Sequence, residues 1–370
     1  MHISITMKLK EIVDCIEDIA PLAYQESYDN AGLICGDVNM EIKGALICLD
    51  STEEVIEEAI NEGCNLVIAH HPIVFSGLKK FNGKTYIERV IMTAIKNEIA
   101  IYVAHTNLDN VKNGVNAKFA EKLGLTNCTT LSPKKDVLKK LITFCPEKDA
   151  EKLRAALFNA GAGTVGEYDN CSFNTLGEGT FRGGENTQPH VGKPGDLHRE
   201  KEYRIETIYP AYLESKVLNA LFKNHPYEEV AFDLLALSNS NNYIGSGLIG
   251  ELPTEKEELS FLKEVGSAMK AEGIRYTALR NKKVKKVAIC GGSGSFLLGN
   301  AIANGADMFI TADFKYHQFF DAEGKIVIAD IGHYESEQYT MELFYELLKE
   351  KFNTFALLIT KTNTNPINYL

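Results

Sequence analysis

The chain has 370 residues, of which 45% are hydrophobic and 24% are charged, so it is long enough for one large core or for two domains. Its formal net charge of -11 argues against a general binder of nucleic acids or of anionic membranes. No apolar run approaches the roughly 20 residues that span a bilayer, which argues against a transmembrane helix.

The first residues lack the architecture of a signal peptide, and Met7 is an alternative start to Met1. The eight cysteines are scattered without a C-x-x-C spacing, which is typical of reduced thiols. We therefore expect a cytoplasmic protein without a cysteine-based metal site or nucleophile.

The first 130 residues alternate between helices and strands. Helical spacing and a capping sequence after residue 50 predict helices over 9–19, 53–63 and 85–97. Short apolar runs predict strands over 44–50, 66–69 and 99–104. Repeated βα units indicate a mainly parallel sheet covered by helices, and ligands of such sheets bind beyond the carboxyl ends of the strands.

A histidine pair ends the 66–69 strand, because His70, His71 and Pro72 follow it directly. Pro72 has no N–H for a strand ladder and disfavours helix at His71, so the strand should stop there. Adjacent strand residues point to opposite faces, so His70 and His71 are poorly placed to share one small ion. They are better placed to serve two neighbouring ions, one each.

From about residue 129 the pattern changes. We expect strands over 138–146, 202–209 and 230–237, helices over 147–161 and 213–224, a polar glycine-rich stretch at 168–184, and a loop at 185–199. The order β-α-β-β-α-β is typical of a ferredoxin-like fold. The linker-like residues 239–243 follow, and the βα pattern then resumes.

The resumed half begins with a helix over 255–270 and ends with a strand over 354–359. Between them we expect strands over 286–290, 307–311 and 326–330 and helices over 296–304 and 333–351. The fold class is therefore a mainly parallel-sheet α/β core split in sequence by an inserted ferredoxin-like α+β domain. The expected domains are a first core half at 1–128, the insert at 129–238, and a second core half at 239–370.

Polar residues gather at the predicted strand ends. Gly332 turns the 326–330 strand into a helix, on whose first turn His333 and Glu337 share one face. Imidazole and carboxylate groups together suit zinc, manganese, iron or nickel. We interpret five residues as a metal site, against the alternative that they are ordinary polar residues at strand ends: His70, His71, Asp109, His333 and Glu337.

The loop at 291–295 has two interpretations. It joins a strand to a helix, so Gly291, Gly292, Ser293 and Gly294 are candidates for binding an anion at a helix N-terminus. It lacks the Walker ending and a complete G-x-G-x-x-G, so a simple tight turn is at least as well supported.

Other polar residues keep structural alternatives. His105 is either a metal ligand, a hydrogen-bonding partner that orients Asp109 or substrate, or a structural residue, and we favour the orienting role. Asp313 either faces the site or starts a helix. A structural role is favoured for His225. Asp29 and Asn30 either form a turn or face a site, and the turn is favoured.

With these residues in hand, the chain resembles the Nif-three-like family of dinuclear-metal proteins, often labelled GTP cyclohydrolase I type 2-like. The resemblance covers residues 7–130 and 240–370. It rests on six motifs in order: YDNAGL from Tyr28, AHHP from Ala69, AHTNLD from Ala104, CGGSGS from Cys290, TADFKYH from Thr311 and GHYESE from Gly332.

The resemblance implies that two ions per chain are held by the five residues of the metal site, with Asp109 and Glu337 best suited to bridging. It also implies toroidal homohexamers whose sites face an internal cavity. The inserted domain is similar to that of longer bacterial members, which looks like PII and CutA-type trimeric proteins.

Together these features predict a metal-dependent hydrolase, with zinc the best-fitting ion, acting through a bridging hydroxide. His105 or Asp313 would move a proton, and an anionic part of the substrate would lie against the 291–295 loop. The family label implies attack at the purine C8 of GTP, which no residue specifies.

The alternative is a non-catalytic metal-binding scaffold or a storage or sensing protein, with the insert serving oligomerisation or regulation. A small molecule and further copies of the chain are the expected partners.

Overall fold

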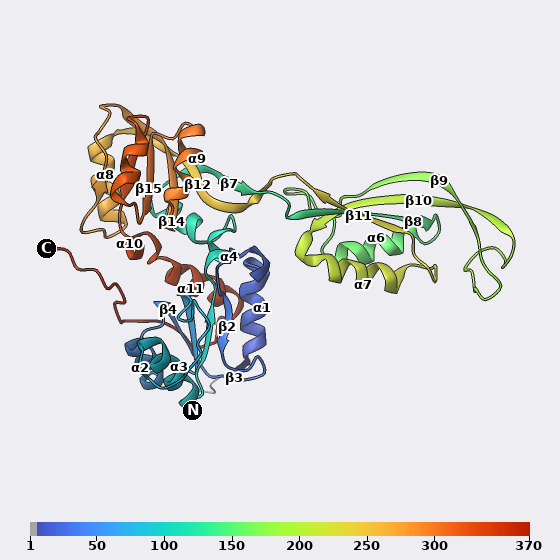
Figure 1. Ribbon diagram of the computed structural model, residues 1–370, viewed down its shortest axis with the longest axis horizontal. Coiled ribbons are helices and arrows are strands. Elements are labelled where there is room, and N and C mark those ends of the chain that lie inside the picture. The colour runs from blue at the N-terminus through green and yellow to red at the C-terminus, as the bar shows by residue number, and fades with distance from the viewer. Residues whose placement is uncertain (1–5) are drawn as a thin grey trace. The chain divides into compact units, whose positions relative to one another are not determined.

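The computed structural model describes residues 6–370, a mixed α/β chain with several sheets that divides into two compact units (Figure 1). The larger unit contains the described residues up to Pro133 together with Ile244–Leu370, and the smaller unit is Lys134–Tyr243. The candidate start Met1 lies outside the described residues, whereas Met7 begins a short strand. Among residues 6–370, no helix is both long and apolar enough to cross a membrane.

A five-stranded sheet forms the first half of the larger unit, in the order β17-β4-β5-β6-β2. Its strands are β2 (Gly32–Cys35), β4 (Ala45–Asp50), β5 (Leu66–His71), β6 (Ala100–Val103) and β17 (Leu357–Ile359). The β17, β4, β5 and β6 neighbours run parallel, and β2 pairs antiparallel with β6. A short separate pair joins β1 (Met7–Lys8) to β3 (Glu41–Ile42).

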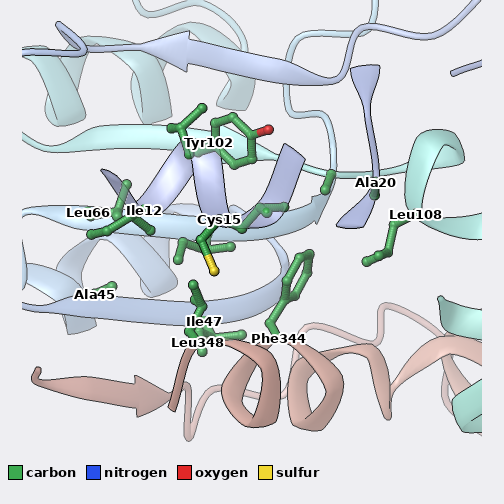
Figure 2. Close-up of a cluster of buried hydrophobic side chains, with 14 of the residues drawn as sticks. Ile12, Cys15, Ala20, Ala45, Ile47, Leu66, Tyr102, Leu108, Phe344 and Leu348 are labelled. Carbon is green, nitrogen blue, oxygen red and sulfur yellow. The ribbon is translucent and has the colours of Figure 1, made fainter. Parts of the chain in front are cut away.

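Helices cover both faces of this sheet because alternate strand residues point to opposite sides. Ala45 and Ile47 of β4 belong to one buried cluster with residues of α1 (Leu9–Ile19) and α11 (Thr340–Lys351), such as Phe344 (Figure 2). Leu46 and Cys48 belong to another cluster, with residues of α2 (Glu53–Asn61) and α3 (Tyr86–Lys96). The parallel strands are therefore buried on both faces.

A six-stranded sheet forms the second half of the larger unit, in the order β13-β16-β15-β14-β12-β7. Its strands are β7 (Thr126–Lys134), β12 (Asn241–Glu257), β13 (Arg275–Tyr276), β14 (Lys283–Ser293), β15 (Met308–Ala312) and β16 (Val327–Asp330). The helices of this half and of its connections are α4 (Thr106–Asp109), α5 (Val115–Lys122), α8 (Glu258–Ala268), α9 (Leu298–Ala303) and α10 (His333–Glu337). The β14, β15 and β16 neighbours run parallel, and β12 and β13 are antiparallel to their partners, so this sheet is mixed rather than mainly parallel.

The smaller unit has an antiparallel sheet in the order β11-β8-β10-β9. Its elements are β8 (Leu138–Pro146), α6 (Ala150–Asn159), β9 (Phe173–Arg182), β10 (Leu197–Pro210), α7 (Glu214–Asn224) and β11 (Phe232–Leu237). One buried cluster joins the two helices to residues of β8 and β10, including Leu141, Ile205 and Tyr209.

Three expectations from the sequence were wrong in detail. The polar stretch at 168–184 contains the strand β9, which pairs with β10 at the edge of the sheet, is mostly exposed, and carries no regular apolar pattern. Residues 241–243, expected to be linker, begin β12. The expected helix over 333–351 is two helices, α10 and α11, separated by Gln338 and Tyr339, whose side chains donate to backbone carbonyls near the end of α8.

Candidate metal centre

Four histidines extend from the carboxyl ends of strands toward one point in the larger unit. His70 and His71 are the last residues of β5, so the strand continues through both. His105 follows β6 and precedes α4, and His333 begins α10 after β16. Gly332 has φ of 95°, a left-handed conformation that suits glycine, and this turn directs His333 back toward the sheet ends.

Each of these imidazoles is held at Nδ1 by an oxygen acceptor. Nδ1 of the fully buried His70 lies 2.9 Å from the carbonyl of Ala104, which can only accept, so His70 carries its proton there. The other three histidines use carboxylates: His71 with Asp50 at 2.7 Å, His105 with Asp29 at 2.8 Å, and His333 with Asp313 at 2.7 Å. In metal sites this arrangement fixes the ring and leaves Nε2 to bind the ion.

Glu337 lies between the Nε2 atoms of three histidines. Its Oε2 lies 2.9 Å from Nε2 of His71 and 3.1 Å from Nε2 of His333, and its Oε1 lies 3.7 Å from Nε2 of His70. Asp109 Oδ1 lies 3.6 Å from Nε2 of His70. His70 and His71 therefore meet different oxygens of one carboxylate.

The donor atoms form three overlapping groups, in each of which all atoms lie within 4.8 Å of one another. Two groups share Glu337: one adds His70 and Asp109, and the other adds His71 and His333. The third group is His70, His71 and His105. The structure thus brings together all five residues of the predicted metal site and adds His105 to them.

Two buried atoms of the centre lack a hydrogen-bond partner, His70 Nε2 and Asp109 Oδ1. Leaving such buried polar atoms unsatisfied costs roughly 1–3 kcal/mol each, more when the group is charged. Both atoms are electron-pair donors that face the same space. A bound cation would satisfy both, so the residues fit a divalent metal ion.

The charges of the centre shift the pKa values of its residues strongly. Burial opposes protonation of His71, but hydrogen bonds to Asp50 and Glu337 outweigh it and raise its pKa to about 9. For His333, burial is likewise outweighed by the charge of Glu337 and by Asp313, and its pKa rises to about 11. The metal-free centre thus holds protons where an ion would bind.

The pKa values of the two carboxylates of the centre, Asp109 and Glu337, shift in opposite directions. Burial, followed by the charge of Glu337, raises the pKa of Asp109 to about 8. Burial acts in the same sense on Glu337, but the neighbouring histidines, His333 first, hold its pKa well below the usual range. A proton shared by the pair therefore lies on Asp109, and a bound cation would displace it.

A cavity of about 700 Å³ opens beside the donor atoms. Its lining includes His71, His105, Asp109, His333 and Glu337. Three aromatic side chains that also line it, Tyr28, Phe75 and Phe296, are at least half exposed. The cavity is large enough for a small organic molecule next to the metal centre.

The glycine-rich loop supports the metal centre directly. Gly292 has φ of 58°, and a Cβ atom there would collide with Oε1 of Glu337 and lie 3.1 Å from its Cδ. The N–H of Gly291 donates to Asn116 and that of Gly292 to Ser336. These two amides are therefore engaged within the protein, which favours the tight-turn interpretation over anion binding at Gly291 and Gly292.

Several interpretations of single residues change. Asp29 was expected to be a turn former, but its carboxylate accepts from His105 and from the Thr106 hydroxyl and N–H, so it supports the centre. His105 is oriented by Asp29, and no hydrogen bond to Asp109 is present among the described residues. The structural interpretation of His225 holds, because its Nε2 lies 2.9 Å from the Phe144 carbonyl.

Asp50 is a supporting residue that the sequence analysis did not identify. It ends β4, and its register partner on β5 is His71. A signal was present, since Asp50 stands at a strand end like the other site residues. Asp313 was predicted either to face the site or to start a helix. The structure favours the first interpretation, because Asp313 contacts Nδ1 of His333.

These features define an α/β protein with a candidate histidine–carboxylate metal centre at the carboxyl ends of strands from two sheets. The chain belongs to the Duf34/NIF3 (NGG1p interacting factor 3) family, whose model matches residues 7–366.

Relatives of known name and structure cover nearly the whole chain. A Bacillus subtilis protein named GTP cyclohydrolase 1 type 2 homolog is 37% identical over 98% of this chain and 98% of its own length. The crystal structure of a Bacillus cereus protein related to NIF3 is also 37% identical, covers 98% of this chain and 99% of its own, and has a TM-score of 0.84. A Staphylococcus aureus protein structure is 29% identical with the same coverage and a TM-score of 0.78.

Proposed function

We propose that the centre binds two divalent metal ions. His70, Asp109 and Glu337 would hold one, and His71, His333 and Glu337 the other, because these are the two groups that share a carboxylate. Glu337 would then be shared by the two ions, because its Oε1 lies near His70 and its Oε2 near His71. Asp109 belongs to only one of these groups, so its geometry supports a terminal rather than a bridging role. Zinc suits the mixed donors best, and iron, manganese or nickel are also compatible.

We infer that the metal-bound protein is a hydrolase. Two divalent ions, when bound, acidify a coordinated water and polarise a substrate oxygen. The chain supplies what such chemistry needs around them: a cavity of about 700 Å³ beside the donors, and an imidazole, His105, on its wall. Asp29 holds Nδ1 of His105, so its Nε2 is directed to the other histidines and can accept or return a proton.

The relatives' name and the cavity support one substrate class. Proteins named GTP cyclohydrolase 1 type 2 homolog are similar to this chain along nearly its whole length, which supports hydrolysis of a ring C–N bond in a purine nucleotide. The exposed aromatic rings of Tyr28, Phe75 and Phe296 at the cavity can stack on a planar base. GTP is therefore the first substrate to test.

The observation that carries the metal proposal is the set of four histidines held at Nδ1 with their Nε2 atoms converging. Metal content measured by plasma mass spectrometry on untagged protein should give about two ions per chain, as a two-metal site requires. Glu337→Gln should lose most of both ions, whereas the exposed control Glu53→Gln should lose none. Metal near zero in the unsubstituted chain, after incubation with zinc, manganese and iron, would overturn the proposal.

The hydrolase proposal has its own test. With metal content matched, the chain should release formate from GTP, and His105→Asn should lower the rate by about 100-fold or more, as for loss of a general acid–base residue. Metal retained without turnover of GTP or of a panel of cyclic amides and phosphodiesters would instead make the protein a non-catalytic metal-binding scaffold.

We propose that the smaller unit is a ferredoxin-like domain inserted into the metal-binding core. Its order of elements, β8-α6-β9-β10-α7-β11, and its antiparallel strand order support this. We further propose that the protein is cytoplasmic, because the eight free cysteines of the chain are compatible with a reducing compartment. We also propose that it assembles as a homohexamer. Sedimentation equilibrium should give about six times the 41.0 kDa chain mass, and a monomer or dimer would contradict the assembly.

A further inference from the structure

We propose that the smaller unit binds a small organic cation, an amine or guanidine with an apolar body, against the carboxylate of Glu202. This site is separate from the metal centre, and the proposal stands without the hydrolase function. It rests on a cavity, on a mostly buried carboxylate with one oxygen that accepts no hydrogen bond from the described residues, and on the side chains around it.

The cavity has a volume of about 640 Å³ and lies on the sheet face opposite the helices. Tyr203 and Ile205 of β10 pack with α6 and α7, whereas the alternating residues Glu202 and Arg204 line the cavity. The other lining residues come from β9, from the segments 183–190 and 227–231, and from Phe144 of β8. A cavity of this size holds a molecule of about metabolite size.

Glu202 is the buried charge in this cavity, with only 8% of its surface exposed. Its Oε1 accepts a hydrogen bond of 2.6 Å from the hydroxyl of Tyr227. Within residues 6–370, no donor reaches Oε2. Oε2 is not among the fully buried atoms that lack a partner, so it is accessible from the cavity, and a cationic ligand there can form a charge-assisted hydrogen bond with it.

The other charged side chains of the cavity do not compensate Glu202. Arg204 directs Nε to Glu206, and Glu178 pairs with Arg199. Arg182 is exposed. Among the described residues, no lysine, arginine or histidine forms a hydrogen bond or an ion pair with Glu202, so a cationic ligand would supply a charge partner that the cavity itself does not give this carboxylate.

Aromatic side chains give the cavity its apolar part. The rings of Phe181 and Tyr227 lie 5.8 Å apart, and Phe144 also lines the wall. Their faces can cover a hydrocarbon body and attract a cation placed over them. The ligand therefore combines one positive group with an apolar or aromatic body.

Glycine makes room for the carboxylate. A Cβ atom at Gly179 of β9 would collide with Oε2 of Glu202 and lie 2.6 Å from its Cδ. A metal ion is not favoured here, because all close groups of histidine, cysteine and acidic donors among the described residues lie in the metal centre.

The test uses the full chain and three probes of one shape: 4-phenylbutylamine, 4-phenylbutan-1-ol and 4-phenylbutyrate. Isothermal titration should show binding of the amine and at least about tenfold weaker binding of the alcohol and the carboxylate, because charge-assisted hydrogen bonds are about twice as strong as neutral ones. Glu202→Gln keeps the side-chain shape and should weaken binding of the amine by at least about tenfold. Glu178→Gln removes an exposed charge from the same cavity and should change binding by less than about threefold.

Tyr227→Phe provides a second variant, since it removes the hydrogen bond to Oε1 and leaves the charge. It should retain amine binding within about fivefold, as loss of one hydrogen bond predicts. Equal binding of the amine and the alcohol, tighter binding of the carboxylate, or no binding of the amine up to its solubility limit would each overturn the proposal. An equal loss of amine binding in the Glu178 and Glu202 variants would overturn the proposal as well.

Discussion

Carboxylates behind the histidines decide which nitrogen of each imidazole faces the metal centre. Asp50, Asp29 and Asp313 accept at Nδ1 of three histidines, and each comes from a different strand end or loop. An imidazole so held loses little conformational freedom when it binds an ion. These acids are therefore as important to the proposed site as the residues that would touch the metal.

Asp50→Asn should lower the affinity for zinc by about 10–100-fold, because an amide holds the His71 proton less well than a carboxylate. Competition with a chromophoric chelator measures the affinity. Asp14→Asn is the matched control, since Asp14 is exposed and pairs with Lys10 on a helix surface. Equal affinities of the two variants would show that Asp50 does not support the centre.

The protons on the metal-free centre predict a pH dependence. With its pKa raised to about 9, His71 is protonated at neutral pH and must lose that proton to bind a metal through Nε2. Asp109, with its pKa raised to about 8, must likewise lose a proton at neutral pH before it can bind a metal. Zinc affinity should therefore rise from about pH 7 to about pH 9, by about tenfold per pH unit for each proton displaced.

Proton release on zinc addition, followed with a pH indicator in weak buffer, checks this linkage directly. About one proton or more per chain should appear at about pH 7. Affinity that is flat or falls over this interval, after correction for hydrolysis of the metal, would contradict it.

At the scale of elements, the turn after β14 is shaped by the side chain packed on it. Gly292 combines a left-handed φ of 58° with close contact to Glu337. The sequence pattern alone was equally consistent with an anion-binding loop, because glycines serve both purposes. The carboxylate of Glu337, 45 positions later, is what requires glycine here.

Gly292→Ala should destabilise the protein by at least about 2 kcal/mol and reduce bound metal, because the methyl group meets Glu337 in a strained backbone conformation. Gly299→Ala is the control: Gly299 lies in α9, a Cβ atom there meets nothing within 4 Å, and alanine favours helix. Denaturant midpoints and metal content measure both effects. Similar results for the two variants would show that the loop is not fitted to Glu337.

Elements with a strong apolar period were predicted well, and elements without one were not. The helix expected over 9–19 matches α1, and the strand expected over 138–146 matches β8. β9 was missed because most of its residues are exposed and its partner strand, rather than a core, holds it in place. Edge strands of this kind carry little signal in their own sequence.

At the scale of the whole molecule, the larger unit is interrupted by the smaller one, but the two chain ends that result lie close together. A Cβ atom on Gly245 would lie 2.8 Å from Cα of Pro133, and Val111 pairs with Ile244. A few residues of linker can therefore close the larger unit without strain.

A variant in which a short Gly-Ser linker replaces Lys134–Tyr243 should fold and keep the metal stoichiometry of the full chain, since none of the candidate ligands lies in the smaller unit. Thermal unfolding and metal content check this, with the full chain as control. Aggregation or loss of metal would show that the larger unit depends on the insert. Sedimentation of the same variant shows whether the insert is needed for the proposed hexamer.

The amino-acid sequence predicted that five candidate residues gather at or near strand ends, and the structure brings their side chains together; it also indicated an α/β chain whose larger unit is interrupted by a second one. Those features depend on local periodicity and on the rule that parallel strands share a carboxyl edge, and both are readable along the chain. The sequence did not reveal Asp29 and Asp50 as partners of His105 and His71, nor the contact of Gly292 with Glu337. These pairs are 76, 21 and 45 positions apart, and each joins residues at or near strand ends of a single sheet, so only the pairing and order of the strands bring them into contact.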